Sequence, residues 1–224
     1  MKSLKLGLSL TSMKYGAWSP ADESNLEAWY KYQTGITLNG SDVSAWADSS
    51  SNSFNMVQAT ASEQPAYNSG AIQFTAADTH NLGSASDITL SGAFTVGIKL
   101  NPDVSNVTVI GSNTTTNEFF KISTSTSLRF KTDGSQVDIS LDSGSFVGDN
   151  YLVITRNSSN LITLYKNGVA QADTETLAGT ADINAIGVRR TDLNPYDGTI
   201  SEIQIYDTES AALTANVNNY LSNL

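Results

Sequence analysis

Cysteine and histidine, which often carry nucleophilic or proton-transfer chemistry, are almost absent from this sequence. The 224 residues include no Cys and a single His, His80. Disulfides, thiolate nucleophiles and cysteine-based metal sites are therefore excluded. One histidine also excludes multi-histidine zinc sites, and a Ser-His-Asp triad would depend on His80 alone. His80 lies in a turn-like stretch after a predicted strand, so we expect an ordinary structural residue.

The polar stretch best suited to bind a ligand is the loop RRTDLNPYDG, residues 189–198. It combines guanidinium, carboxylate, amide and aromatic groups between two predicted strands. The candidate ligand-binding residues are Arg189, Arg190, Asp192, Asn194 and Tyr196. Polar groups of these types reach sugar hydroxyls, and an exposed aromatic face packs against sugar C–H groups. The alternative is an Arg–Asp pair within the loop that serves the loop alone.

Three tryptophans are the largest aromatic candidates for a binding surface. Trp29 and Trp46 lie in apolar segments, which favours core packing for both. Trp18 lies in the N-terminal segment, and we expect it to be available for docking onto a partner. Aromatic side chains are frequent at such contacts because they bury a large area.

Short alternating strands must position these residues. Asn39-Gly40 predicts a hairpin turn, and the strands 151–156 and 161–166 flank a four-residue turn at 157–160. Only the C-terminus has helical spacing, in Leu213, Val217 and Leu221, with Thr214 as the expected cap. Strands at regular spacing predict an all-β, two-sheet antiparallel jelly-roll sandwich with a short C-terminal helix.

The first residues of the chain form a separate pattern. Leu4, Leu6, Leu8 and Leu10 alternate with polar or small residues, which predicts a strand. Such a strand pairs with the domain's own sheet edge, with another copy, or with a different protein. We therefore divide the chain into an N-terminal arm with a docking strand, residues 1–20, and one domain, residues 21–224. The docking residues expected in the arm are Leu4, Leu6, Leu8, Leu10 and Trp18.

Composition excludes several classes of partner. The net charge is −10 and charged residues make up only 15% of the chain. Nucleic-acid binding needs a basic stripe, and anionic membrane surfaces repel an acidic chain. No apolar run approaches the length of a membrane span, and the N-terminus does not fit an export signal. We expect synthesis in the cytoplasm, with neither nucleic acid nor membrane insertion.

Several segments together carry a family resemblance. The segments GAFTVGIKLNP, YLVITRNSSNLITLYKNGV and YDGTISEIQIYD, followed by a short helix, resemble the second half of laminin-G-like and concanavalin-A-like lectin jelly rolls. The final strand has the family form in Tyr196, Gly198, Ile200, Glu202 and Tyr206. The stretch VSAWADSSSNSFNMVQATASEQPAY resembles the first half. The resemblance covers roughly residues 25–224 and implies the jelly-roll fold.

The resemblance also raises an enzyme and a calcium site for consideration. Laminarinase-type hydrolases with this fold carry a strand with the pattern Glu-x-Asp-x-x-Glu, and this sequence lacks that pattern. The nearest residues to it are Asp173 and Glu175, which we expect in a loop. Glu118 stands beside two aromatics without a partner nearby in sequence. We therefore predict no enzymatic activity and no cofactor. Structural calcium, held by many relatives, is doubtful because Ser201 occupies the position of a frequent Asp ligand, and Asp48 is expected to cap its own turn.

The opening of the chain resembles jelly-roll proteins of tailed bacteriophages, notably those of marine bacteria. This resemblance rests on the leucine-alternating leader, then SPAD, then LEAWYK. It implies a non-catalytic virion surface or structural protein, as capsid decoration, tail or fibre component, located in the virion. Its partners would be other virion proteins, further copies of itself, or a cell-surface glycan. The alternative function is a stand-alone carbohydrate-binding module.

Overall fold

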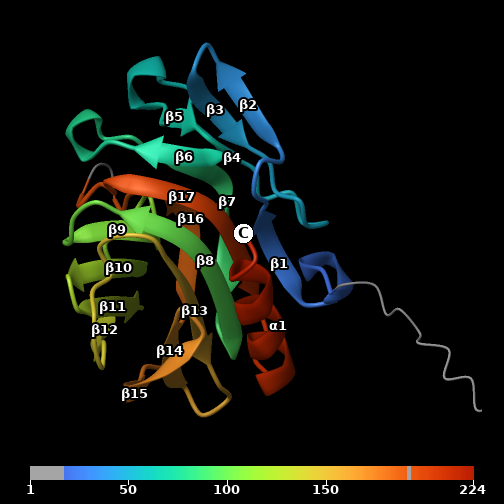
Figure 1. The fold of residues 1–224 in the computed structure, drawn as a ribbon, viewed down its shortest axis with the longest axis vertical. Helices are drawn as coiled ribbons and strands as arrows, with labels where there is room; N and C mark the ends of the chain where they lie inside the picture. Colours follow the sequence, from blue (N-terminus) through green and yellow to red (C-terminus); the bar gives the residue numbers. More distant parts are fainter. Residues whose placement is uncertain (1–17, 191–192) are drawn as a thin grey trace, which may run out of the picture.

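A computed structural model describes residues 18–190 and 193–224, and in them antiparallel strands form two packed layers with one helix (Figure 1). The N-terminal elements are a 3₁₀ turn η1 (Pro20–Asp22), β1 (Leu26–Tyr30), β2 (Ile36–Asn39), β3 (Asp42–Trp46), β4 (Met56–Val57), η2 (Ala61–Glu63), β5 (Ala66–Asn68), β6 (Ala71–Phe74) and η3 (Ala76–Asp78). The central elements are β7 (Leu82–Leu90), β8 (Phe94–Pro102), β9 (Val107–Gly111), β10 (Phe119–Thr124), β11 (Ser127–Thr132) and β12 (Ser135–Ser140). The C-terminal elements are β13 (Asn150–Arg156), β14 (Leu161–Lys166), β15 (Val169–Thr176), β16 (Ala181–Ile186), β17 (Gly198–Tyr206) and α1 (Ala211–Leu221).

The first layer runs in the order β1–β17–β8–β13–β14–β15. Its clearest element is the β13–β14 hairpin, whose strands and turn confirm the sequence prediction. Asn157 organises the turn, because its side-chain oxygen accepts bonds from the backbone N–H groups of Ser159, at 2.9 Å, and Leu161, at 3.0 Å. Asn160 takes the left-handed conformation, with φ 63°, which asparagine tolerates better than most residues.

The second layer runs in the order β7–β16–β9–β10–β11–β12. The strands β2 to β6 connect the two layers at one end, where β4 pairs with β7 and β6 pairs with β17. The predicted hairpin at Asn39-Gly40 is confirmed as the β2–β3 pair. These pairings are those of an antiparallel sandwich, as the alternating sequence predicts.

The main core lies between the layers. Inward-facing apolar side chains of both sheets belong to one buried cluster. Phe94 of the first layer stacks on Phe120 of the second, with ring centroids 5.9 Å apart. Phe120 in turn meets Phe130 edge-to-face at 5.0 Å. Since inward and outward residues alternate along a strand, the neighbours of these phenylalanines on the same strands face away from the core.

Helix α1 covers the outer face of the first layer, against β8 and β13 (Figure 1). Leu213, Val217 and Leu221 are buried there together with Trp29 and Tyr206, which confirms the predicted apolar spacing. The expectation that Thr214 caps the helix is wrong. Ser210 is the cap, because its hydroxyl accepts a 3.1 Å bond from the backbone N–H of Leu213. In the described part of the chain no helix has the length and apolarity needed to cross a membrane.

Candidate functional site

The outer face of the second layer carries two rows of side chains. Strand pairing aligns one row as Thr108, Lys121, Arg129 and Asp138, and the other as Gly111, Phe119, Lys131 and Gln136. The alternate residues of the same strands belong to the inner core cluster. We call the set Phe119, Lys121, Arg129, Lys131 and Arg189 the cationic face.

Arg189, from the loop after β16, lies over Phe119. The carbon at the centre of its guanidinium is 4.3 Å from the ring centroid, a cation–π distance. Its Nη2 donates a 2.6 Å hydrogen bond to the side-chain oxygen of Asn194. Gly111 leaves room for this arrangement, because an added Cβ would lie 3.2 Å from the Arg189 Cβ and 3.3 Å from the Phe119 Cβ. The guanidinium is therefore held in a fixed orientation.

Lys121 is the most enclosed cation of the face, only 6% exposed. Burial is the first cause that lowers the pKa of its ammonium group, followed by the nearby charges of Arg189 and Arg129. Among residues 18–190 and 193–224, no residue forms a hydrogen bond or an ion pair with the Lys121 side chain. Thr108, its neighbour in the row, is fully buried and its hydroxyl likewise has no partner there.

The other two cations differ from Lys121 in their partners. Arg129 makes a two-pronged contact with Asp138, from Nε at 2.8 Å and from Nη2 at 2.7 Å. This hydrogen-bonded contact raises the pKa of Arg129. The Lys131 Nζ lies 5.9 Å from the Phe119 ring centroid. Four of the chain's 12 lysines and arginines thus gather on one face of an acidic protein.

An amide-rich area continues the same outer face toward β16 and β7. Asn184 donates from Nδ2 to Asp87 at 2.6 Å, and its oxygen accepts from the backbone N–H of Asn113 at 2.7 Å. Thr89 donates to Asp182 at 2.7 Å. The polar groups of this area therefore bond mainly to one another, while the cationic face has donors to spare.

The predicted loop residues fall into different places. Arg189 and Asn194 meet at the cationic face, and Arg190 is exposed beside them. Asp192 lies outside the described residues, so both its role and the alternative Arg–Asp pair stay predictions. The expectation that Tyr196 is an exposed platform is wrong. Tyr196 is fully buried, packs edge-to-face on Phe74 at 5.8 Å, and donates to the Thr199 carbonyl at 3.3 Å.

Sequence reasoning missed Phe119, Lys121, Arg129 and Lys131. The signal was present in FFKIS and LRFKT, where alternation places the ring and the cations on the side opposite the apolar core residues. What alternation did not reveal is that β10 and β11 are neighbours whose register puts Lys121 opposite Arg129. It also did not reveal that Arg189 lies over Phe119 of β10.

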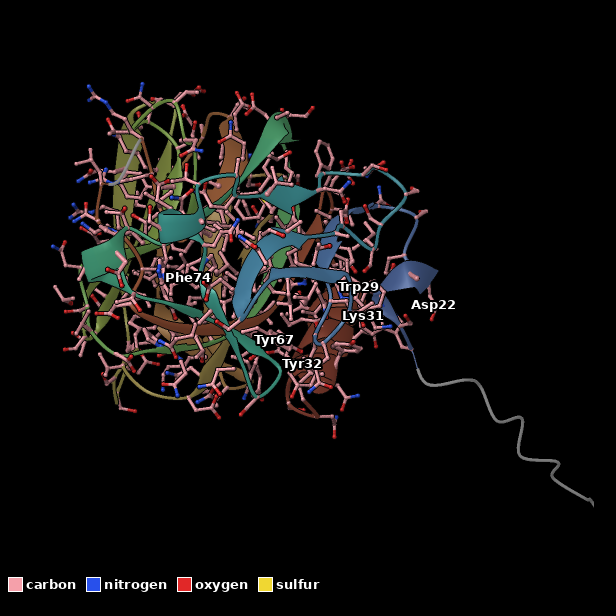
Figure 2. The ribbon with its side chains drawn as sticks, turned by 90° about the horizontal axis from the view of Figure 1, so that it is seen from above. Asp22, Trp29, Lys31, Tyr32, Tyr67 and Phe74 are labelled. Atoms are coloured by element: carbon pink, nitrogen blue, oxygen red, sulfur yellow. The ribbon has the colours of Figure 1, made fainter. Side chains whose placement is uncertain are left out.

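The tryptophans are now placed. Trp29 and Trp46 are buried, which confirms core packing for both. The Lys31 Nζ lies 4.7 Å from the Trp29 ring centroid, and Figure 2 labels the two residues next to each other. Trp18 is half-buried against its own domain, edge-to-face with Tyr220 at 6.1 Å and bonded from Nε1 to Glu23 at 2.8 Å. Docking of Trp18 onto a partner therefore stays a prediction.

The remaining arm residues of the sequence analysis are not placed. Leu4, Leu6, Leu8 and Leu10 lie outside the described residues, so the docking strand stays a prediction. The boundary between arm and domain at residue 20 also stays a prediction. Trp18 and the buried Pro20 already pack against the domain.

The residues at the family's calcium position do not fit a cation. Glu202 is fully buried, and its carboxylate accepts hydrogen bonds from Trp29 Nε1, from the Tyr32 backbone N–H and from Gln204 Nε2. Asp48, as predicted, organises its own loop, accepting from the backbone N–H groups of Trp29, Ser50 and Phe54. Carboxylates engaged by N–H donors have few lone pairs left for a metal. The described ranges hold no group of three or more His, Asp or Glu placed to bind one.

The carboxylates considered for hydrolysis lie on a strand or in a buried position. Asp173 and Glu175 lie on β15, so the expectation of a loop is wrong, and Asp173 accepts a 2.7 Å bond from the backbone N–H of Ser140. Glu118 is buried, which is the first cause of its raised pKa; the charge of Asp182 raises it further. Its Oε2 has no hydrogen-bond partner among the described residues.

Two antiparallel layers packed face to face, with one helix on the outer face of the first layer, define an antiparallel β-sandwich. The chain belongs to the concanavalin A-like lectin/glucanases superfamily, since the family model of laminin G type matches residues 68–216. No protein among the curated sequences compared with it matches the chain.

Solved structures of several binding domains share the fold. Domain 4 of AbnA, a GH43 extracellular arabinanase from Geobacillus stearothermophilus solved with arabinotriose, aligns with a TM-score of 0.64 and 18% identity over 88% of this chain and 98% of that one. The binding domain of Paraclostridial Mosquitocidal Protein 1 aligns with a TM-score of 0.61 and 14% identity over 92% of this chain. The binding domain of botulinum neurotoxin serotype D/C aligns with 0.58 and 14% over 91%. This chain spans 53% of each of these two binding-domain chains.

Proposed function

We propose that this chain is a non-catalytic carbohydrate-binding domain whose ligand lies on the cationic face. The observation that carries the proposal is the fixed guanidinium of Arg189, held by the Phe119 ring and by Asn194. Donors held in place lose little conformational freedom when a ligand binds, so each hydrogen bond contributes more to affinity. The AbnA domain solved with arabinotriose, which has the same fold, supports a sugar as the ligand class.

The absence of catalysis is part of the proposal. Hydrolysis with retention needs two carboxyl groups about 5 Å apart on either side of the scissile bond. The carboxylate on the cationic face, Asp138, is engaged by Arg129, and Asp182 accepts from Thr89. Glu118 is the carboxyl group with an unsatisfied oxygen nearby, so Glu118→Gln is the variant that checks for an acid catalyst. We expect no release of reducing sugar from any bound polysaccharide by either form.

Calorimetric titration after a glycan-array screen tests binding. For the best array ligand we expect Arg189→Ala and Asn194→Ala each to weaken affinity by about tenfold, the effect of losing or loosening a hydrogen bond to a charged group. The matched control is Lys99→Met, whose ammonium pairs with Asp149 at 3.1 Å on β8 of the other layer. A flat array, or binding that both site variants leave unchanged, would overturn the proposal.

A virion role is the second candidate function and concerns a different surface. The bacteriophage-like opening of the sequence supports capsid decoration or a tail or fibre component, made in the host cytoplasm and held by virion proteins or by further copies. A hollow of about 380 Å³, lined by Trp18, Tyr220 and Leu224 among others, lies where the predicted arm joins the domain. Apolar hollows of this kind favour protein contacts.

Light scattering coupled to size exclusion tests the arm. We expect the chain without residues 1–12 to remain folded and to lose assembly, because each well-buried leucine contributes about 1.5–3 kcal/mol. Identical masses for the full and shortened chains, both monomeric, would remove the support for self-assembly. Attachment of the shortened chain to its virion partner at full strength would show that the arm is not the docking element.

A further inference from the structure

We infer that the cationic face recognises an anionic substituent of a sugar, a carboxylate or a sulfate, through Lys121 and Arg189. The inference rests on the proposed glycan-binding function and names the class of glycan. It concerns the described part of the chain, residues 18–190 and 193–224. Three observations support it: the local excess of positive charge, the burial of Lys121, and the covered aromatic ring.

The local charge is opposite to that of the whole chain. The protein carries a net charge of −10, yet Lys121, Arg129 and Lys131 lie in two adjacent rows of one sheet face, and Arg189 lies over Phe119 of the same face. Among the described residues only Asp138 forms an ion pair with any of them. Cations brought together in this way repel one another, and an anion bound between them relieves that repulsion.

Lys121 is the strongest single indication of an anion. The residue is 6% exposed, and its side chain forms no hydrogen bond or ion pair with the described residues, although the nearby charge of Asp138 favours the protonated form. Burying a charged ammonium without a partner costs several kcal/mol in general, so such groups are normally paired. The hydroxyl of the adjacent Thr108 and the Nε of Arg189 are buried without partners among the described residues, whereas the Lys121 ammonium keeps some access to solvent. Two buried polar atoms without partners, beside an ammonium group without a protein partner, are surroundings that an oxyanion would satisfy.

The aromatic ring of the face is not available for the usual stacking contact with a neutral sugar. Phe119 is only 2% exposed and lies beneath the Arg189 guanidinium. Recognition at this face therefore depends on charge and hydrogen bonding, with little contribution from an open aromatic platform. This favours an acidic or sulfated glycan over a neutral one.

The experiment compares matched pairs of ligands by calorimetry at low ionic strength. The first pair is an oligogalacturonate of defined length and its methyl ester, which has the same backbone without charge. The second pair is dextran sulfate and dextran. We expect the charged member of at least one pair to bind at least tenfold more tightly than its neutral partner. That preference should shrink as salt rises from about 50 to 500 mM, because salt screens exposed charges.

Substitutions locate the site. Lys121→Met keeps the length of the side chain and removes its charge, and we expect a loss of tenfold or more for the charged ligand. Lys131→Met is the more exposed second variant, which keeps the test valid if Lys121→Met unfolds. Lys99→Met, with its ion pair on the other layer, should bind as the unmodified chain does.

Each outcome tests either glycan binding itself or the recognition of an anionic substituent. Equal binding of charged and neutral members overturns the anionic class and leaves glycan binding standing. No binding to any array glycan or to either pair overturns both. Preference for the carboxylate pair or for the sulfate pair assigns the substituent. Tighter binding of a single-stranded oligonucleotide than of either charged glycan would overturn the inference in favour of phosphate recognition.

Discussion

The indole Nε1 of Trp29 donates a hydrogen bond to the buried carboxylate of Glu202, a residue 173 positions later in the sequence. The contact joins β1 to the last strand, β17, beneath helix α1. The carboxylate also accepts from the backbone N–H of Tyr32 and, at 3.1 Å, from Gln204. The family glutamate therefore connects β17 to β1 and to Tyr32, which closely follows β1.

Glu202 gives the stability of the protein a defined dependence on pH. Burial raises the pKa of its carboxyl group, although the hydrogen bonds from Trp29, Tyr32 and Gln204 oppose the shift. A raised pKa means that the native protein still holds a proton that the unfolded chain releases near pH 4.3, roughly the ordinary value for Glu. The contribution of Glu202 to the free energy of unfolding is therefore full below that pH and is lost as pH rises through the native pKa.

Urea unfolding of the unmodified chain and Glu202→Gln, from pH 4 to 8, checks this expectation. The difference in free energy of unfolding between the two should decline as pH rises. Trp29→Phe removes one N–H donor to the Glu202 carboxylate, so the pKa of Glu202 should rise further. In that variant the loss of unfolding free energy should therefore extend to higher pH. A difference that is constant across the range would contradict the assignment.

Gly97 sets how closely helix α1 approaches β8. A Cβ added at Gly97 would lie 2.5 Å from Val217 Cγ1 and 3.2 Å from Leu221 Cδ1. We expect Gly97→Ala to destabilise the fold by about 1–3 kcal/mol, the usual cost of overpacking, as measured by urea unfolding. Gly92→Ala is the control, because a Cβ there has no atom within 4 Å. Equal stability of the two variants would show that the helix shifts without cost.

Arg156 is a fully buried cation with a structural role. It donates to the backbone carbonyls of Gly92 and Gly179, both at 2.7 Å, and of Leu90 at 3.0 Å. We expect Arg156→Met to cost on the order of 3 kcal/mol in unfolding free energy, since buried carbonyls are left without donors. Lys99→Met removes a largely surface ion pair and should cost about 0–1 kcal/mol. Similar urea midpoints for Arg156→Met and Lys99→Met would show that the buried cation contributes no more to stability than the surface ion pair.

Substitutions of Tyr196 test whether this residue belongs to the core or contacts the ligand. Because the ring is fully buried against Phe74, Tyr196→Ala should lower the unfolding free energy by about 3–5 kcal/mol. Tyr196→Phe loses only the bond to the Thr199 carbonyl and should cost about 1 kcal/mol. Glycan affinity of the Phe variant should be unchanged. A selective loss of affinity at full stability would restore the discarded role of Tyr196 as a platform.

Local pattern was sufficient for the strands and turns. The hairpin at 157–160 and the apolar stripe of the C-terminal helix depend on residues close in sequence, and both were predicted. The cap was assigned to Thr214 instead of Ser210, because several Ser and Thr residues near a helix start can accept the same backbone bond. For Asp173 and Glu175 the turn at Asn167-Gly168 predicts a following loop, whereas the chain continues after that turn as β15.

The sequence by itself determined the class of fold, since period-two alternation and frequent turn residues leave an antiparallel sandwich as the consistent arrangement. It also determined that Arg189 and Asn194 belong to a polar loop. Only the tertiary structure decided which cations meet. Lys121 and Arg129 lie opposite each other through strand register, and Arg189 reaches Phe119 from a loop 70 residues away in the numbering. Burial of Tyr196 was equally undecidable, because an aromatic residue in a polar loop packs inward only when a distant strand supplies Phe74.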